Sequence, residues 1–285
     1  MIDIQVLLTV FNRREKTLEA LHHLYKNQNP NVRLLVTLFD DGSQDGTAAA
    51  IAAQFPEVQV LTGDGSNYWN GGMRRAWEVA KRSQPEFYLW LNDDTLLDSS
   101  AIRNLLDTSA FFADQAIIVG STRDPETGAL TYGGVVRKSR WKPVRFHIVS
   151  PGSTPIRADT MNGNCVLVPR GVEQKLGILS PAYTHSMGDF DYGLRAKKLN
   201  IEMWIAPEFV GTCGRNQIFG TWQDTALTKK ARWFKLIGVK GLPPKEWAAF
   251  TYRHGGVLWP ITWLSPYIKC LLAPTASRAQ TDSGN

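Results

Sequence analysis

The chain has 285 residues, of which 43% are hydrophobic and 20% charged, with a formal net charge of +6 and a pI near 9.2. These values are those of an ordinary globular protein and exclude a chain that is disordered throughout. The positive charge fits a nucleotide substrate, an anionic lipid or a nucleic acid, and does not choose among them. Only residues 276–285 read as a frayed tail.

Cysteine usage and the first residues indicate the compartment. Cys165, Cys213 and Cys270 are widely spaced and odd in number, so they form neither a disulfide framework nor a CxxC zinc pattern. The sequence starts with Met-Ile-Asp-Ile and enters a strand without a signal segment. The late apolar stretch 257–273 is interrupted by two prolines and a lysine, which argues against a membrane span. We therefore expect a cytoplasmic protein.

Strands and helices alternate through the first third of the chain. Apolar runs predict strands over residues 4–10, 32–39, 58–61 and 87–91. Between them the sequence predicts a helix over residues 15–27, a helix that opens with Asp45 or Thr47 as its N-cap, a loop at 67–72 and a helix over 73–82. Alternation at this spacing predicts a doubly wound α/β fold, in which helices flank a mostly parallel sheet.

The pattern is looser after residue 94. It predicts a helix at 99–112, a strand at 116–120, a hairpin at 130–136, a strand at 164–169, a helical turn at 171–176, a helix at 188–199 capped by Asn200, and a final strand at 201–206. Residues 122–153 are rich in glycine, proline and basic residues. We expect substrate specificity to lie in loops of this kind.

The character of the sequence changes again after residue 213. Lysines and arginines accumulate there with few acids, interleaved with tryptophans. Basic side chains beside aromatic ones suit a membrane interface, and the alternative is a helical appendage whose tryptophans pack onto the main domain. The alternatives are equal for Trp222 and Trp233, and the membrane is favoured for Trp259 and Trp263. We predict two domains, residues 1–213 and a helical C-terminal extension over residues 214–285.

Three acidic clusters stand at the ends of predicted core elements. Asp40-Asp41 and Asn92-Asp93-Asp94 each follow an apolar strand, and Asp189-Phe190-Asp191 opens a helix. Because parallel strands end at the same edge of a sheet, where open α/β sheets place their ligands, we expect the first two clusters to lie together. Adjacent acids repel each other unless a cation neutralises them. Their hard oxygen atoms suit Mg²⁺ or Mn²⁺, which in turn binds a diphosphate.

These acids can divide the chemistry of a transfer reaction among them. Asp40 can accept from a nucleobase N–H or a ribose hydroxyl, Asp94 can hold the metal, and a carboxylate of the third cluster can deprotonate an acceptor hydroxyl. The structural alternative is a helix cap or a strand-end turn, which we expect for Asp45 and Asp98. The strand-end motif alone leaves both interpretations open, and the presence of three such clusters favours the functional one.

The ordered set of motifs resembles a known enzyme family. The motifs are Thr9-Val10-Phe11-Asn12-Arg13, Asp40-Asp41-Gly42-Ser43-x-Asp45-Gly46-Thr47, Asn92-Asp93-Asp94 and Gly188-Asp189-Phe190-Asp191-x-x-x-Arg195. Over about residues 4–213 the chain resembles family 2 inverting glycosyltransferases of GT-A fold. The segment Trp69-Asn70-Gly71-Gly72-Met73 adds to a similarity with bacterial enzymes of surface polysaccharide, including rhamnosyl- and galactofuranosyltransferases.

The resemblance implies a role for each matching residue. Asp94 would bind a divalent metal, Mn²⁺ or Mg²⁺, through which the diphosphate is held, and Asp189 would be the general base, supported by Asp191 and Arg195. Apart from the resemblance, Arg74 or Arg75 at the start of their predicted helix could contact phosphate, and we expect at least one of them to be merely solvated. The nucleotide-sugar site would consist of Thr9, Phe11, Asn12, Arg13, Asp40, Asp41, Trp69, Gly71, Gly72, Asn92 and Asp93.

The implied partners follow from the same resemblance. The donor would be a UDP- or dTDP-linked sugar, and the acceptor a glycan or lipid-linked glycan of a surface polysaccharide. Residues 214–273 would contact the inner membrane surface. We expect no nucleic acid, because the basic residues lie in the C-terminal segment without a recognisable nucleic-acid-binding motif.

The sequence departs from the family pattern at three positions. Asn92 replaces the first acid of the metal motif, and Gly188 stands where the family usually has Glu before its base. Cys213 aligns with a metal-ligand histidine of many members, although a thiol is a poor ligand for Mg²⁺. His185 is the nearest alternative histidine, and a lone loop histidine is more often surface structure.

Two other functions remain as alternatives. A nucleotidyltransferase also uses strand-end carboxylates and a metal, but it usually adds a Gly-rich phosphate loop, which residues 11–14 lack. A non-catalytic carbohydrate- or lipid-binding relative would be expected to have lost Asp94 or Asp189, and both are present. We therefore predict an inverting glycosyltransferase that works by single displacement.

Overall fold

The computed structural model describes residues 1–27, 29–139 and 143–273. The chain divides into two compact units, Met1–Arg215 and Asn216–Asn285. The first unit thus ends at residue 215, where the sequence predicted an end at residue 213. The expected frayed tail at residues 276–285 lies outside the described residues.

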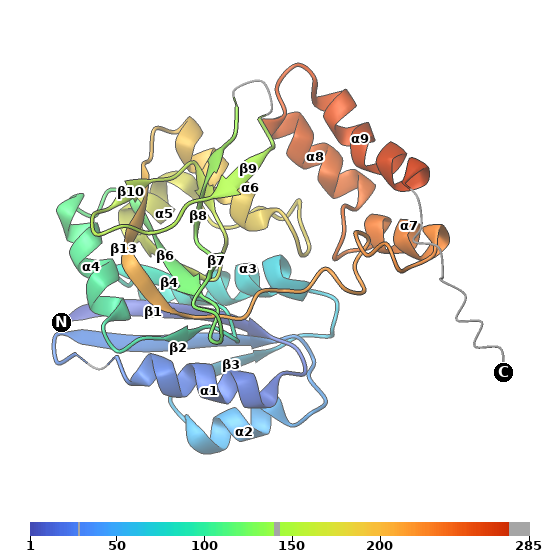
Figure 1. The fold of residues 1–285 in the computed structure, drawn as a ribbon. Helices are drawn as coiled ribbons and strands as arrows, with labels where there is room; N and C mark the ends of the chain where they lie inside the picture. The colour runs from blue at the N-terminus through green and yellow to red at the C-terminus, as the bar shows by residue number, and fades with distance from the viewer. Residues whose placement is uncertain (28, 140–142, 274–285) are drawn as a thin grey trace. The chain divides into compact units, whose positions relative to one another are not determined.

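The first unit begins with a regular alternation of strands and helices (Figure 1). In chain order the elements are β1 (Ile2–Val10), α1 (Arg14–Tyr25), β2 (Val32–Asp40), α2 (Thr47–Gln54), β3 (Gln59–Thr62), α3 (Tyr68–Ala80), a 3₁₀ turn (Lys81–Ser83) and β4 (Phe87–Leu91). Each predicted strand of this part is present within two residues of its expected bounds. The predicted α/β fold is confirmed.

The rest of the first unit has shorter elements. They are β5 (Leu96–Leu97), α4 (Ala101–Phe111), β6 (Ile117–Arg123), β7 (Leu130–Tyr132), β8 (Gly134–Arg137), β9 (Phe146–Ile148), β10 (Ile156–Arg157), β11 (Thr160–Met161), β12 (Cys165–Pro169), α5 (Arg170–Leu176), α6 (Gly188–Lys198) and β13 (Met203–Thr212). The end of α6 is followed by Asn200 in the left-handed conformation (φ 57°), as predicted.

One large sheet organises the unit. Its described strands have the order β10-β13-β6-β12-β4-β1-β2-β3, with β5 paired to β13 and β7 to β6. The part β4-β1-β2-β3 is parallel, and beyond β4 parallel and antiparallel pairs are mixed. Because β1, β2 and β4 run in the same direction, the loops that follow them lie at one edge of the sheet. A second sheet has the order β11-β8-β9.

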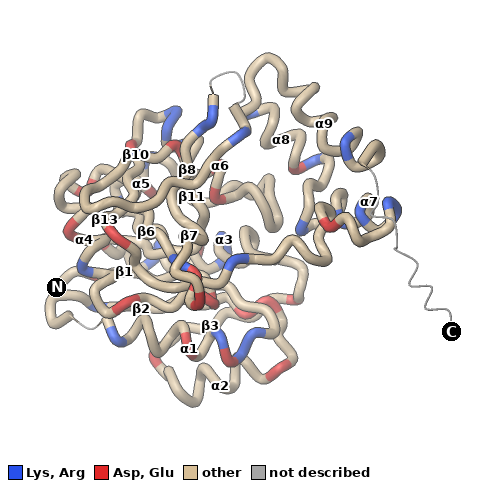
Figure 2. The backbone as a smooth tube through the Cα atoms, viewed as in Figure 1, with Lys and Arg blue, Asp and Glu red and all other residues tan. Residues whose placement is uncertain are grey.

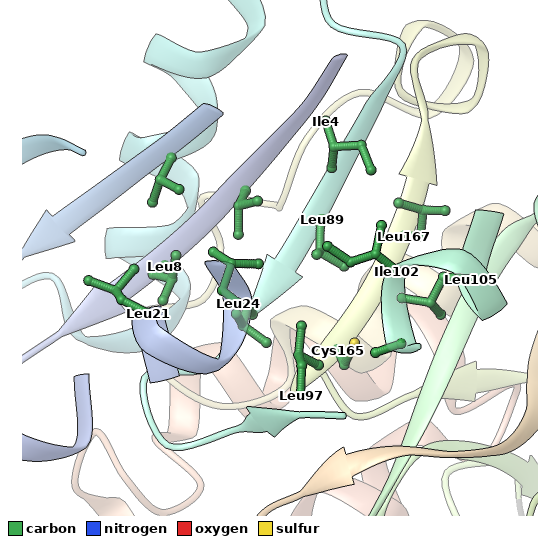
Figure 3. Packing of buried hydrophobic residues seen from close by; sticks show 14 of the residues in the cluster. Ile4, Leu8, Leu21, Leu24, Leu89, Leu97, Ile102, Leu105, Cys165 and Leu167 are labelled. Carbon is green, nitrogen blue, oxygen red and sulfur yellow. The ribbon is translucent and has the colours of Figure 1, made fainter. Parts of the chain in front are cut away.

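Side chains on the two faces of the sheet enter two separate cores. On one face, alternate β1 residues such as Ile4 and Leu8 pack with leucines of α1 and α4, as Figure 3 shows. On the other face, Leu7 and Trp90 pack with Trp77 of α3 and with α6. Both faces of β4 are therefore buried, which explains why its sequence is continuously apolar. The sheet is a rigid support for the loops at its edge.

The predicted loop at residues 67–72 is wrong, because α3 begins at Tyr68. Two adjacent glycines, Gly71 and Gly72, are unfavourable inside a helix. In the structure a Cβ atom on Gly72 would overlap the Thr9 side chain. The glycine lets α3 pack directly on β1, and this close packing outweighs the low helix propensity.

The predicted hairpin at residues 130–136 is also wrong. β7 pairs with β6, whereas β8 pairs with β9 and β11. Between them a Cβ atom on Gly133 would lie 2.6 Å from the Ser121 hydroxyl, so the chain passes close to β6 there and crosses from one sheet to the other. Alternating apolar residues predicted that these segments are strands but did not predict which strands they pair with.

The last strand is longer than the predicted range 201–206. β13 continues past Pro207 to Thr212, with an irregular register between Ile205 and Gly211 and with Glu208 in the left-handed conformation (φ 57°). Such a bulge bends a strand without ending it. The extra length carries the chain to Cys213 at the candidate site.

The second unit is helical, as predicted. It contains α7 (Lys229–Ile237), α8 (Pro244–His254) and α9 (Trp259–Leu272). Leu236, Tyr267 and Cys270 form its core, against which Trp222, Trp233, Trp247 and Trp263 pack. Trp263 packs against this core and its indole N–H donates to Pro244 O (3.0 Å), which favours the structural alternative for this residue, while the membrane role predicted for Trp259 stays a prediction. Among the described helices, none is both long and apolar enough to span a membrane.

Candidate active site

The centre of the candidate site is the end of β4. After the buried run to Leu91, the backbone N–H of Asn92 donates to Asn164 O (3.0 Å), and Thr95 N donates back to Asn92 O (3.2 Å). This turn leaves Asp93 buried and Asp94 half-buried. The predicted strand-end turn and the acidic cluster thus coexist in the same residues.

Arg13 neutralises the two acids. Its Nη1 atom donates to Asp93 Oδ1 and to Asp94 Oδ2, each at 2.9 Å. Burial raises the pKa of Asp93 to about 6, an effect that Arg13 opposes and that the neighbouring Asp94 reinforces. The resemblance grouped Arg13 with the donor site, and the structure brings it to the metal motif. The ion pair joins residues that are far apart in the sequence, so the sequence pattern could not predict it.

Cys213 lies beside Asp94, as its alignment with a metal ligand implied. Its thiol faces Asp94 Oδ1 at 3.5 Å and accepts from Asn164 Nδ2 at 3.5 Å. Burial, reinforced by the Asp94 carboxylate, raises the pKa of the Cys213 thiol to about 12. A neutral thiol is a poor ligand for Mg²⁺ or Mn²⁺.

The carboxylate pair fits a divalent ion that is shared with a substrate. In the described part of the chain, no three or more His, Cys, Asp and Glu side chains are grouped to hold a metal. Mg²⁺, however, is commonly bound through one or two carboxylates plus substrate phosphates, and needs no cage of protein ligands. Asp93 and Asp94 supply such carboxylates, and an ion there would compete with Arg13 for their oxygen atoms.

The loop after β1 is tied to the loop after β2. Asn12, in the left-handed conformation (φ 51°), donates its N–H to Ser43 Oγ (2.8 Å), and its side chain accepts from Gln44 N (2.7 Å). Phe11 is 52% exposed and available to stack on a base. Thr9 is half-buried against α3. Asn12 therefore joins the two loops, and a nucleotide pocket lined by Thr9, Phe11 and Asn12 stays a prediction.

Asp40 and Asp41 are both buried at the end of β2. Asp40 Oδ1 accepts from Ser43 N (2.8 Å). Asp41 accepts from the backbone N–H groups of Gly65 (3.1 Å), Asn67 (3.0 Å) and Tyr68 (2.8 Å). The Asp41 carboxylate therefore holds the loop that leads into α3, and its predicted part in a nucleotide site stays a prediction.

Trp69 lies between Asn92 of the predicted metal motif and Asp189, the predicted general base. Its indole N–H donates to Asn92 Oδ1 (2.8 Å), so the residue that replaces the first acid orients this ring. The same ring lies so close to Gly163 that a Cβ atom there would overlap it. Gly163 N in turn donates to Asp189 Oδ2 (3.1 Å). The described structure thus brings Asn92, Trp69 and Asp189 into one continuous set of contacts.

Asp189 lies on the first turn of α6 and is half-buried. Besides Gly163 N, its carboxylate accepts from Phe190 N (2.8 Å). Burial raises the pKa of Asp189 to about 6, although both N–H groups act in the opposite direction. A carboxylate with this pKa is ionised at neutral pH and is a stronger base than an ordinary aspartate.

The neighbours of Asp189 on α6 are structural, as predicted. Asp191 is fully buried, accepts from Arg195 Nε (2.8 Å) and from the Tyr183 hydroxyl (3.1 Å). Arg195 also donates to Leu176 O (3.0 Å) and Ile178 O (2.9 Å). This network fixes the start of α6 and hence the position of Asp189.

The remaining charged residues and the histidine that the sequence analysis named make contacts within the protein. Asp98 pairs with Arg123 (2.8 Å), and Asp45 accepts from Thr47 N (3.1 Å), although the N-cap residue of α2 is Gly46. His185 contacts Tyr68 and Trp69 at the start of α3. Arg74 and Arg75 both pair with Glu78 on the same helix, at 2.8 Å and 3.5 Å.

Sequence reasoning missed Asn70 and the loop 162–164. Asn70 is fully buried, and its Nδ2 donates to Ser180 O (3.0 Å) and Tyr183 O (2.6 Å) in the segment that leads to Asp189. A Cβ atom on Gly188 would overlap Asn70 Oδ1, which explains why glycine stands where the family usually has Glu. The Asn-Gly-Asn run between two short strands was the available signal for the loop.

Comparison with known proteins identifies the family of the chain. A model of the family described as Glycosyl transferase family 2 matches residues 5–174, more than half of the chain. The match includes the loops after β1, β2 and β4 and ends before Asp189. No curated protein matches the chain. With its curled central sheet flanked by helices, the first unit has the GT-A glycosyltransferase fold, and the chain belongs to glycosyl transferase family 2.

Proposed function

We propose that this glycosyltransferase inverts the anomeric configuration of the sugar that it transfers, by a single displacement. The observation that carries the proposal is the contact series from Asn92 through Trp69 and Gly163 to Asp189. It joins an acidic strand end, suited to a divalent ion that binds a diphosphate, with a separate carboxylate suited to a general base. Family membership implies a nucleotide-sugar donor and an acceptor.

In the proposed reaction Asp189 is the general base. Its carboxylate takes the proton of the acceptor hydroxyl while the hydroxyl oxygen attacks the anomeric carbon and the bond to the diphosphate breaks. The pKa near 6 supports this role, because the group is ionised at pH 7 yet basic enough to assist. Its hydrogen bonds to Gly163 N and Phe190 N hold one orientation.

The leaving nucleoside diphosphate needs compensation of its developing negative charge. Arg13, held by Asp93 and Asp94, lies at the strand end where the diphosphate is expected. A divalent ion, Mn²⁺ or Mg²⁺, bound to Asp94 and Asp93 would supply further positive charge there. Phe11 and Asp40 are proposed to bind the base and ribose, and Asn12 and Asp41 to hold their loops.

We propose a UDP- or dTDP-linked donor and a glycan or lipid-linked acceptor of a bacterial surface polysaccharide. This part rests on the sequence resemblance to rhamnosyl- and galactofuranosyltransferases. A lipid-linked acceptor would lie at the inner membrane surface, which we propose residues 214–273 contact from the cytoplasm. The basic composition of this segment supports the proposal.

A thermal-shift panel tests the donor site. UDP, dTDP, GDP and CMP are each added with and without Mn²⁺ to wild type, to Asp94→Ala and to the control Asp107→Ala, which removes an exposed carboxylate of α4. A ligand that binds only the folded protein raises its melting temperature. We expect one diphosphate to stabilise wild type and Asp107→Ala in the presence of Mn²⁺, and Asp94→Ala much less. No shift with any nucleotide would contradict the proposal.

A further inference from the structure

The second unit exposes an unusual amount of apolar surface. Of the fifteen large hydrophobic side chains that are exposed in the described residues, eleven lie after residue 215. Five of them form what we call the α9 stripe: Ile261, Leu264, Ile268, Leu271 and Leu272, which are 44% to 76% exposed. Exposed apolar surface of this extent marks an interaction site.

The stripe is one face of one helix. With about 100° of rotation per residue, the side chains of its five members fall within an arc of about 100° around α9. The opposite face carries Tyr267 and Cys270, which are buried in the core of the unit, and Trp263, which packs against it. The helix is therefore apolar on both faces, and only one face is used by the described part of the unit.

The charge of the unit indicates what covers the other face. Residues 216–285 contain nine of the 32 Lys and Arg residues and three of the 26 Asp and Glu residues. The remaining 23 positive and 23 negative side chains belong to residues 1–215, where they give no net charge. The whole net charge of +6 thus belongs to the second unit. From residue 247 to residue 273 there is no acid, and both Arg253 and Lys269 are exposed. Figure 2 shows the basic and acidic positions of the unit along its backbone.

We propose that the α9 stripe inserts into the surface of an anionic lipid bilayer, with α9 lying parallel to that surface. A helix of 14 residues is about 21 Å long, too short for a hydrocarbon core of about 30 Å, so it fits the interface and not a span. Lys269 lies beside the stripe, where a long basic side chain reaches headgroup phosphates. The aliphatic stripe, and not the packed tryptophans, is then the inserting surface.

Pairing of the stripe with a second copy of the chain is less consistent with these charges. A symmetric contact through α9 would bring together two units that each carry +6. Repulsion opposes that contact, whereas an anionic bilayer attracts the same unit. The inference deepens the membrane contact proposed above and does not depend on the transfer reaction, since vesicle binding by an inactive protein would still support it.

The test uses the full-length chain and sucrose-loaded vesicles that are either pure phosphatidylcholine or a mixture with phosphatidylglycerol. The variant Ile261→Gln/Ile268→Gln removes two exposed aliphatic side chains, and Leu199→Gln, a 54% exposed leucine of the first unit, is the matched control. We expect co-sedimentation of wild type and control with the anionic vesicles only, and at least a tenfold weaker association of the stripe variant. Circular dichroism verifies that both variants are folded.

A second measurement separates insertion from simple charge attraction. Because the native cysteines are buried, Leu264→Cys can be labelled with a polarity-sensitive fluorophore, with Leu199→Cys as control. A blue shift at position 264 alone on addition of anionic vesicles is expected. Binding without this shift, or with the stripe variant unaffected, would overturn insertion, and so would absence of binding. A dimer in light scattering that the stripe variant abolishes, without vesicle binding, would assign the face to self-association.

Discussion

At the scale of single residues, Asp189 has the properties that its proposed role requires. It is half-buried, accepts from two backbone N–H groups, and burial raises its pKa to about 6 from an ordinary value of 3.8. Only the ionised form can accept a proton from the acceptor hydroxyl. If Asp189 is the proposed base, its pKa sets the acid limit of the reaction.

The first prediction concerns this limit. We expect kcat/KM to rise about tenfold per pH unit below pH 6 and to level off above it, because Asp189 loses its proton through this range. The rate is measured from pH 4.5 to 8 with saturating metal. Nucleotide diphosphate binding, followed over the same range by its thermal shift, separates an effect on the base from an effect on Asp93. A rate that is flat down to pH 4.5 would contradict the assignment.

A second prediction concerns Arg13, whose guanidinium is the countercharge of Asp93 and Asp94. The variant Arg13→Met leaves this pair without a cation, so we expect a lower stability, by about 1–3 kcal/mol in metal-free buffer. We also expect several-fold tighter binding of Mn²⁺, because the ion no longer competes with Arg13. Calorimetric titration with Mn²⁺ measures the affinity.

The neighbouring arginine supplies the control for this prediction. Arg14 is exposed and pairs with Glu15 on the same helix, away from the acidic pair. Arg14→Met is expected to leave Mn²⁺ affinity unchanged. Equal effects of the two substitutions, or weaker Mn²⁺ binding by Arg13→Met, would show that Arg13 does not compete with a metal ion.

At the scale of elements, the close approach of α3 and α6 positions Asp189, the proposed general base. Asn70 of α3 reaches the segment before α6 and occupies the space that a side chain at Gly188 would need. We predict that Gly188→Ala lowers the free energy of unfolding by about 1–3 kcal/mol and reduces activity, because the overlap displaces either helix. Chemical denaturation measures the change.

A glycine in an uncrowded helix gives the comparison. A Cβ atom on Gly171, in α5, would meet nothing within 4 Å, so Gly171→Ala is expected to be neutral or stabilising by up to about 1 kcal/mol. If Gly188→Ala were equally benign, the contact with Asn70 would not determine the residue at this position.

The elements also show what the sequence can and cannot predict. The buried run of β4 and the acids after it were predictable, because local apolar pattern and strand direction determine both. The start of α3 was not predictable. Gly72 is favourable inside this helix only because it packs directly against Thr9, which is far away in the sequence. The partners of β7 and β8 were missed for the same reason.

The candidate site divides in the same way. Motif residues such as Asp94 and Asp189 carry their chemistry in their own side chains and could be named from the sequence. The link between Arg13 and Asp94 and the contact of Trp69 with Asn92 join distant segments. Neither has a local pattern, so the structure was needed to find them.

At the scale of the whole molecule, the net positive charge and the candidate active-site residues belong to different units. The site residues described above all precede residue 216, in a unit with equal numbers of acids and bases. The second unit carries the net charge of +6. This separation predicts that surface association and nucleotide binding respond differently to salt.

Raising NaCl from 0.05 to 0.5 M is therefore expected to weaken association with anionic vesicles strongly, as the screening length falls from roughly 14 Å to roughly 4 Å. The thermal shift caused by the nucleotide diphosphate and Mn²⁺ should change little, because that site has short, partly buried charge contacts. Both are measured on the same full-length preparation. Vesicle association that is insensitive to salt would contradict the role of the basic unit.

In the proposed reaction Asp189 is the base of a single displacement with inversion. The most direct measurement is the anomeric configuration of the product by NMR, together with the rates of wild type and Asp189→Asn, using the donor that the thermal-shift panel identifies. We expect a product of inverted configuration and a rate reduced by at least about 100-fold in Asp189→Asn, with nucleotide stabilisation intact. A product that keeps the configuration of the donor, or an Asp189→Asn variant of near wild-type rate, would contradict it.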